Sequence, residues 1–275
     1  LWLWKIVVPT LGRIVSADRL RREFEARTPK AFLQRHEADP LLSDTFDMAL
    51  LGRHLNPLSF GLGPDVIRRD FTFATIDENN RQLWEHDFVR LFDGVARKAL
   101  AFDAGNPDGR KRRIFIKGHF LCAADALARK YPDAVFLTMI REPVSRLRSC
   151  VNFLRVNPFT MSLGRAAPWA WLGEGIGRSE TGYCHVEHDW FTRPDGPRRC
   201  VLRFSEYVRD LEATMRRVYS ECLDTPALPP HVPTEHTRRE RHNYQIDRSL
   251  AQVGIDEDAV RDQLSDYIDW CRSPG

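Results

Sequence analysis

The chain has 275 residues, of which 43% are apolar and 29% are charged, and its formal net charge is +3 at pH 7. This composition is ordinary for a soluble globular protein, and the length provides ample material for a core. The mild charge suits an anionic cofactor but not a nucleic-acid-binding protein, for which a stronger and more clustered basic excess is expected. We therefore expect a single domain over residues 1–275 and no nucleic-acid partner.

The cysteines give no sign of a metal site or of a dense disulfide framework. No C-x-x-C pair occurs among the six, which are Cys122, Cys150, Cys184, Cys200, Cys222 and Cys271. Free cysteines are usually buried, and scattered thiols of this kind are typical of a reducing compartment. We expect reduced, mostly buried thiols in a cytoplasmic protein.

The N-terminal residues 1–15 are apolar but too short to cross a membrane, which takes about 20 apolar residues. Lys5, Pro9 and Arg13 interrupt the stretch, and it lacks the layout of a signal peptide. A helix that packs on the domain is the favoured interpretation. The alternative is a helix on a membrane surface, which would give the chain a peripheral membrane contact through residues 1–15.

The first 110 residues are predicted to be mainly helical. Residues 17–39 are rich in charge and suggest a helix pair broken at Pro29, residues 43–55 suggest another helix, and apolar spacing predicts a helix over 80–100. The basic run at 110–113 is interpreted as a solvated flank before a buried strand, because most charge runs are solvated.

Residues 114–154 alternate between strand and helix patterns. We predict strands at 114–116 and 134–140, a helix at 123–130, and a second helix that begins near Pro143, since proline suits the first helical turn. The near-continuous apolar strand at 134–140 implies burial on both faces. The fold class is therefore α/β, with a parallel sheet flanked by helices over residues 111–275.

Polar residues follow both predicted strands. Lys117 and His119 come after the first strand, Arg141 comes after the second, and Ser149 lies in the helix that follows. Ligands of parallel sheets bind beyond the carboxyl ends of the strands. An arginine at a helix N-terminus, backed by amide dipoles and a hydroxyl, suits a phosphate.

This spacing resembles the central segment of sulfotransferases that use 3′-phosphoadenosine 5′-phosphosulfate. The sequence R-E-P-V-S-R-L-R-S matches the family form R-D-P-x-x-x-x-x-S, K-G-H matches K-T-H, and KYPDAVFL resembles a strand entry of bacterial members. The resemblance implies a fold like that of P-loop NTPases. It also implies transfer of a sulfuryl group to a hydroxyl or amine, with 3′-phosphoadenosine 5′-phosphate as product and no metal.

The resemblance also implies residue roles. Lys117 would neutralise the leaving phosphate oxygen, His119 would act as base, and Arg141 and Ser149 would hold the 3′-phosphate, with Arg241 closing over it. The alternatives are a hydrogen-bonded loop histidine at 119, a salt bridge between Arg141 and Glu142, and a solvated arginine at 241.

The family's loop for the 5′-phosphosulfate, of the form G-x-x-R-S-G-T-T, does not occur in this sequence. The nearest glycine cluster, at residues 61–64, lacks the basic residue and the hydroxyl of that loop, and residues 44–48 resemble a stretch that lies downstream of it. We expect an N-terminally truncated sulfotransferase. The alternatives are a non-catalytic or degenerate nucleotide-binding homologue and another phosphate-loop transferase of kinase type.

The remaining segments carry weaker signals. Residues 157–195, where the family's acceptor could bind, are predicted to be a lid or surface loop. A metal site at 184–188 is disfavoured, because the sequence offers no further ligands at a matching spacing. We predict a parallel strand at 199–204 and helices at 210–222 and 256–271. The acceptor could be a small molecule, a carbohydrate or a lipid, and the oligomeric state is not assigned.

Overall fold

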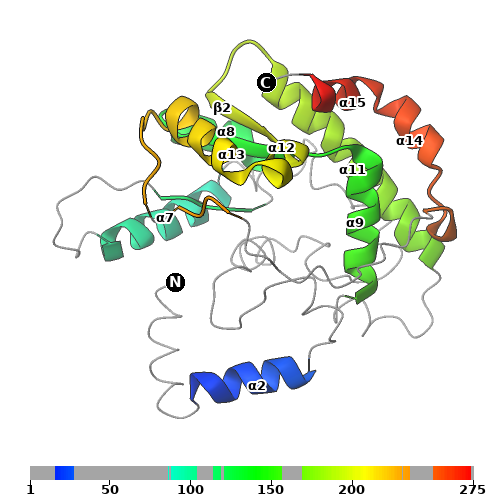
Figure 1. Cartoon of the computed structure of the whole chain (residues 1–275), viewed down its shortest axis with the longest axis horizontal. Helices are drawn as coiled ribbons and strands as arrows, with labels where there is room; N and C mark the ends of the chain where they lie inside the picture. Colours follow the sequence, from blue (N-terminus) through cyan, green and yellow to red (C-terminus); the bar gives the residue numbers. More distant parts are fainter. Residues whose placement is uncertain are drawn as a thin grey trace. The chain divides into compact units, whose positions relative to one another are not determined.

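The computed structural model describes residues 16–27, 86, 88–103, 114–118, 121–156, 169–230, 232–235 and 250–273. Helices dominate this part of the chain, and two strands lie near its middle (Figure 1). In chain order the elements are α2 (Ala17–Arg27), α7 (Val89–Asp103), η2 (Leu121–Ala123), α8 (Ala124–Lys130), β1 (Val135–Ile140), α9 (Pro143–Val156), α11 (Trp169–Thr192), β2 (Arg198–Arg203), α12 (Phe204–Arg209), α13 (Leu211–Arg217), η3 (Val218–Cys222), η4 (Ala251–Val253), α14 (Glu257–Gln263) and α15 (Ser265–Arg272).

The chain forms two compact units. The first comprises residues 1–70, 76–126 and 153–167, and the second comprises 71–75, 127–152 and 168–275. Both strands and the helices from α11 to α15 belong to the second unit. The single domain expected from the sequence stays a prediction.

The described helices of the first unit differ in character. α2 is a charged helix whose start is capped by Ser16, because the Arg19 amide donates to the Ser16 hydroxyl at 3.2 Å. Phe88, at the start of α7, is buried together with Val89, Phe92 and Ala96 of that helix, which marks one apolar face. α2 and α7 confirm the first helix of the pair predicted at 17–39 and the latter part of the helix predicted at 80–100. The predictions for residues 1–15, 28–39 and 43–55 lie outside the described residues.

The strand predicted at 114–116 is wrong. Residues 114–117 have no regular secondary structure, and the side chain of Phe115 is 78% exposed. A strand needs a hydrogen-bonded neighbour, and the sheet within the described residues pairs β1 with β2 instead. A short apolar run could not indicate on its own that it lacks such a partner.

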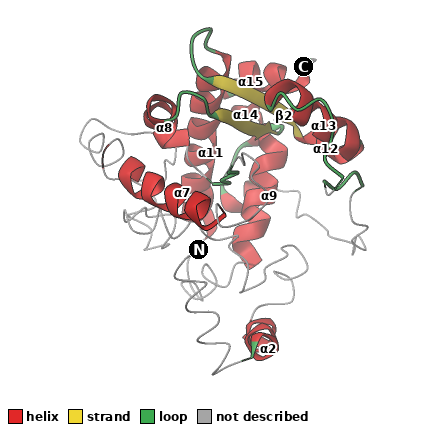
Figure 2. Ribbon diagram, turned by 90° about the vertical axis from the view of Figure 1, so that its left-hand side faces the viewer, coloured by secondary structure: helices red, strands yellow, loops and turns green. Residues whose placement is uncertain are grey.

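The sheet confirms the predicted fold class. β1 and β2 are parallel and pair from Val135 with Arg198 to Ile140 with Arg203. Figure 2 shows the strands side by side with helices around them. Both strands begin and end within one residue of their predicted bounds. The connection between them contains α9 and α11, as expected for a parallel crossover.

Each face of the sheet is covered by a different helix. The ring of Phe136 contacts that of Trp190 of α11, with centroids 5.0 Å apart, so the face that carries Phe136, Thr138 and Ile140 packs on α11. On the opposite face Cys200 and Leu202 form a buried cluster with residues of α13 and η3. The strands therefore lie between two helical layers.

The lid or surface loop predicted at 157–195 is wrong for residues 169–192, which form the long helix α11. Glycines at four positions argued against a helix, because glycine costs about 1 kcal/mol relative to alanine in a helix interior. One of them has a packing role. A Cβ on Gly173 would lie 1.7 Å from the carbonyl oxygen of Val253, so α11 approaches the backbone of η4 too closely for a side chain.

The expectation of reduced thiols is wrong for two cysteines. A disulfide joins Cys200 of β2 to Cys222 of η3 with Cα atoms 5.9 Å apart. Both residues are buried in the same apolar cluster, so the bond fixes η3 to the strand. Among the described residues Cys150, Cys184 and Cys271 are free, as expected.

The C-terminal helix predicted at 256–271 is interrupted once. α14 begins after Asp256, whose carboxylate accepts hydrogen bonds from the amides of Asp258 and Ala259, and α15 follows after a break at the buried Leu264. None of the helices within the described residues combines the length and apolarity required to cross a bilayer.

Candidate functional site

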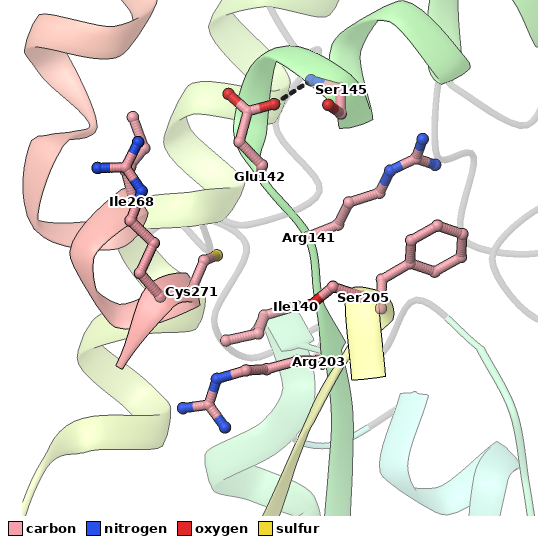
Figure 3. A pocket seen from close by; sticks show the side chains of 10 residues that line it. Ile140, Arg141, Glu142, Ser145, Arg203, Ser205, Ile268 and Cys271 are labelled. Carbon is pink, nitrogen blue, oxygen red and sulfur yellow. Dashed lines mark hydrogen bonds between the residues drawn. The ribbon is translucent and has the colours of Figure 1, made fainter. Parts of the chain in front are cut away.

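The carboxyl ends of the two strands place arginines on opposite faces of the sheet. Arg203 is paired with Ile140 and shares its face, whereas Arg141 follows Ile140 and points the other way. The Arg141 guanidinium carbon lies 4.4 Å from the centroid of the Phe204 ring, which is a cation–π contact. Figure 3 shows the two arginine side chains leaving the strand ends in opposite directions.

A pocket of about 370 Å³ lies at these strand ends. It is bounded by the junctions of β1 with α9 and of β2 with α12, and by the last turns of α15. The described residues that line it are Ile140, Arg141, Glu142, Ser145, Arg203, Phe204, Ser205, Ile268, Cys271 and Arg272. The lining thus includes three arginines, one carboxylate and two hydroxyls, and one of the arginines, Arg272, forms an ion pair with Asp269 at 3.9 Å. Guanidinium and hydroxyl groups suit a phosphate-type anion.

Glu142 occupies the N-terminus of α9. Its carboxylate accepts hydrogen bonds from the amides of Val144 at 3.2 Å and Ser145 at 2.7 Å. These amides would otherwise be unpaired at a helix start. The phosphate-binding role predicted for amides at this helix start stays a prediction, and in this structure these two donate to Glu142 instead. Anion binding in the pocket must therefore come mainly from the arginines and hydroxyls.

Beside the pocket, a buried carboxylate of α11 joins that helix to β1, α9 and α15. Glu187 of α11 accepts hydrogen bonds from Thr138 of β1, from Arg146 of α9 at 3.1 Å and from Tyr267 of α15 at 2.6 Å. Arg146 also forms an ion pair with Glu180 at 2.6 Å. The network fixes the first half of α9, which carries pocket residue Ser145, against α11.

The protonation states of this network follow from its charges. Burial acts to lower the pKa of Arg146, but the carboxylates of Glu180 and Glu187 outweigh it and hold that pKa well above its ordinary value. Burial, together with the charge of Glu187, raises the pKa of Tyr267 far above its ordinary value. Arg146 is therefore charged and Tyr267 is a neutral donor at physiological pH.

Comparison with known protein families matches residues 63–226 to the sulfotransferase family. The match covers more than half of the chain and includes both strands and the residues at their carboxyl ends. The chain belongs to the sulfotransferase family. No curated protein and no solved structure matches it. Family membership gives the chain a role in sulfuryl transfer and a P-loop-like α/β fold, with which the helix-flanked parallel strands agree.

The predicted site residues of this sulfotransferase do not all lie at the strand-end pocket within the described part of the chain. Arg141 lines the strand-end pocket. Ser149 lies one helical turn beyond Ser145 on α9, is half-buried, and is not among the described residues that line the pocket. Lys117 is exposed in the first compact unit. His119 and Arg241 lie outside the described residues, so their roles, like that of Ser149, stay predictions.

Several residues that line the pocket were not predicted from the sequence, namely Ser145, Arg203, Ser205 and Arg272. Arg203 had a detectable signal, since it is a charged residue at the end of the apolar run C-V-L, and the segment was assigned a structural role. Ser205 follows it directly. Arg272 has no such signal, because only the packing of α15 brings it to the strand ends.

The segment C-H-V-E-H, considered above as a metal site, is part of α11. Cys184 and Glu187 are buried and His185 is exposed, so these side chains leave different sides of the helix. Burial raises the pKa of the Cys184 thiol to about 12. Within the described ranges no group of three or more His, Cys, Asp or Glu side chains could hold a metal ion. Metal-independent transfer stays a prediction.

Proposed function

We propose that this sulfotransferase moves a sulfuryl group from 3′-phosphoadenosine 5′-phosphosulfate to a hydroxyl or amine acceptor. The main support for this donor is that the chain belongs to the sulfotransferase family and that its Arg141 lines a basic pocket at the carboxyl end of β1. This is where parallel sheets bind their ligands, and a guanidinium is well suited to a phosphate monoester.

The donor supplies an activated sulfuryl group when bound, and the chain supplies charge and position. Arg141 binds the 3′-phosphate, and its stacking on Phe204 restricts the side chain before the ligand arrives. Ser149 and Arg241 are proposed as further ligands of that phosphate. Sulfuryl transfer resembles phosphoryl transfer in that positioning and charge stabilisation dominate the catalysis.

The residues after Ile116 are proposed to carry the chemistry. Lys117 neutralises the leaving phosphate oxygen, and His119 takes the proton from the acceptor. A positioned base of this kind contributes about 10²–10⁴-fold to the rate. The acceptor is proposed to be a small molecule, a carbohydrate or a lipid.

Calorimetric titration of 3′-phosphoadenosine 5′-phosphate tests the donor assignment. We expect binding without added metal that is weaker for adenosine 5′-phosphate and about 10- to 100-fold weaker for Arg141→Ala, since a charge-assisted phosphate contact contributes about 1.5–3 kcal/mol. Arg216→Ala is the matched control, because Arg216 is exposed on α13 and pairs with Glu212 outside the pocket.

Equal affinity for the two nucleotides would contradict the proposal, because the 3′-phosphate would then contribute nothing. Tighter binding of ATP with magnesium would favour the kinase-type alternative. If the 3′-phosphate is recognised, radiolabelled sulfuryl transfer to candidate acceptors separates an enzyme from a non-catalytic homologue.

A further inference from the structure

Three walls of the strand-end pocket come from β1, α9 and α15. Ile140 is the last residue of β1, Ser145 lies in the first turn of α9, and Ile268 and Cys271 lie on α15. Figure 3 shows these side chains on separate segments of the chain. Because α15 is remote in sequence from the other two elements, tertiary contacts must fix its distance from them.

The side chain of Glu187 on α11 is bonded to all three of these elements. Glu187 is 2% exposed and is not among the described residues that line the pocket. Its carboxylate accepts hydrogen bonds from one side chain of each element, and each donor lies one or two positions from a residue that lines the pocket. The pairs of donor and lining residue are Thr138 with Ile140, Arg146 with Ser145, and Tyr267 with Ile268.

The donors from α9 and α15 meet at a single atom. Arg146 donates to Oε2 of Glu187 at 3.1 Å and Tyr267 donates to the same oxygen at 2.6 Å, while the hydroxyl of Thr138 donates to Oε1. Hydrogen bonds restrict both distance and direction, which apolar contacts do not. The shared oxygen therefore restricts how far the α9 and α15 walls can lie from each other.

Stability alone is a weak reason for this arrangement. Replacing a buried ionic network by apolar side chains of similar volume is often neutral or stabilising, and in some proteins such networks are retained because they specify one arrangement of the packed elements. Apolar packing also holds α15, since the Trp270 ring contacts His188 of α11 with centroids 5.3 Å apart. What the carboxylate adds to that packing is a defined geometry.

We propose that Glu187 is a positioning residue of the strand-end pocket, whose carboxylate sets the spacing of the β1, α9 and α15 walls. Without its hydrogen bonds α15 keeps its apolar contacts, but its position relative to α9 is less narrowly defined. The consequence for nucleotide binding rests on the proposed function, whereas the spacing of the walls can be tested without a ligand.

Tyr267→Phe tests the inference, because it removes one hydroxyl and keeps the ring that contacts Trp270 with centroids 5.4 Å apart. Cys271 lies one helical turn after Tyr267, lines the pocket, and has a thiol whose pKa is raised by burial to about 12, so it should react slowly in the native protein. We expect iodoacetamide to label Cys271 about tenfold faster in Tyr267→Phe, since a hydrogen bond to a charged group opposes local opening by about that factor. Peptide mapping measures the rate at this residue.

Val218→Ala is the control for stability. Val218 is buried in the apolar cluster on the face of the sheet opposite α11, so the change lowers the Tm without touching the network. At a temperature well below both Tm values, we expect Val218→Ala to keep the wild-type labelling rate. A role of Tyr267 in stability alone would give both variants the same rate.

Nucleotide affinity is the second measurement. We expect the Kd for 3′-phosphoadenosine 5′-phosphate to be about three- to tenfold weaker in Tyr267→Phe, because part of the binding energy is needed to order the walls. We expect Val218→Ala to bind like the wild type. Glu187→Gln loses the charge that all three donors share, so its labelling rate and Kd should change at least as much as those of Tyr267→Phe.

The outcomes separate this inference from the proposed donor. If the wild type does not distinguish 3′-phosphoadenosine 5′-phosphate from adenosine 5′-phosphate, the donor assignment fails, and the labelling rates still decide the positioning role. If Tyr267→Phe is labelled no faster than Val218→Ala, the positioning role is overturned while the donor stands. Faster labelling with unchanged affinity for a recognised 3′-phosphate would also overturn it, because the spacing of the walls would then not matter to the ligand.

Discussion

At the scale of single residues, Glu187 is the clearest example of how this protein stabilises a charge away from water. A buried carboxylate is tolerated when all its oxygen lone pairs have partners. Glu187 receives donors from β1, α9 and α15, and only one of them, Arg146, is charged. Arg146 in turn contacts Glu180 and stacks over the Tyr183 ring at 4.5 Å. The network therefore contributes to stability as a unit.

Glu187→Gln should destabilise the protein by roughly 2–4 kcal/mol, because it removes a buried charge and leaves Arg146 with Glu180 as its remaining carboxylate partner. Glu212→Gln is the control, since Glu212 is half-exposed and pairs with Arg216 one helical turn away. That change should cost no more than about 0.5 kcal/mol. Urea unfolding measures both values. Equal costs would mean that the network contributes no more than a surface pair.

The site residues that could be predicted from the sequence are those that directly follow a recognisable strand. Arg141 follows a recognisable strand and was placed correctly at its carboxyl end. Glu142 lies at the same strand end, but the sequence could not show that its carboxylate would accept hydrogen bonds from the first amides of α9. Arg272 required knowledge of where the last helix packs, which is a long-range property that no local pattern contains.

At the scale of elements, α11 shows how glycine can support a helix that local propensity disfavours. Its glycines lower the intrinsic stability of the helix, and the packing of Cys184, Glu187 and Trp190 against the rest of the second unit compensates. Gly173 has a specific role, because the backbone of Val253 lies where a side chain would begin. Gly182 has no atoms within 4 Å of the corresponding position.

Gly173→Ala should therefore destabilise the protein by about 1–3 kcal/mol, as expected for overpacking in a close contact. Gly182→Ala should stabilise it by up to about 1 kcal/mol, because alanine is the better helix former. Thermal unfolding of the two variants gives the comparison. If Gly173→Ala were as stable as Gly182→Ala, the close approach of α11 to η4 would be refuted.

Strand and helix positions were predictable where the periodicity was strong. The boundaries of β1, β2 and α9 follow from apolar runs and from Pro143, all of which are local signals. The strand at 114–116 and the loop at 169–192 were assigned incorrectly for complementary reasons. Apolar character does not guarantee a neighbouring strand, and glycine content does not exclude a helix that is stabilised by packing.

At the scale of the whole molecule, a disulfide bond links strand β2, which lies between two helical layers, to a helical segment that follows it in the chain. The disulfide between Cys200 and Cys222 joins β2 to η3 within the second compact unit. Disulfides persist mainly in oxidising compartments. The cytoplasmic location expected from the sequence stays a prediction, and the disulfide argues against it.

Reduction of this disulfide should lower the free energy of unfolding by roughly 2–4 kcal/mol, chiefly because the unfolded chain regains freedom. Peptide mapping without reductant should recover a linked pair of peptides that contain Cys200 and Cys222. The double variant Cys200→Ala and Cys222→Ala should be less stable than the wild type and insensitive to reductant. A wild-type protein with unaltered stability in reductant would show that the bond has no such role.

The disulfide has a practical consequence for anyone who assays this sulfotransferase. Arg203, Phe204 and Ser205 lie between Cys200 and Cys222 in the sequence, so three of the ten described residues that line the strand-end pocket belong to a covalently closed ring. Buffers with dithiothreitol, routine in protein purification, would open that ring. A preparation that fails to bind nucleotide under such conditions says little about the oxidised protein, and the thiol content of each sample should be measured before its activity is judged.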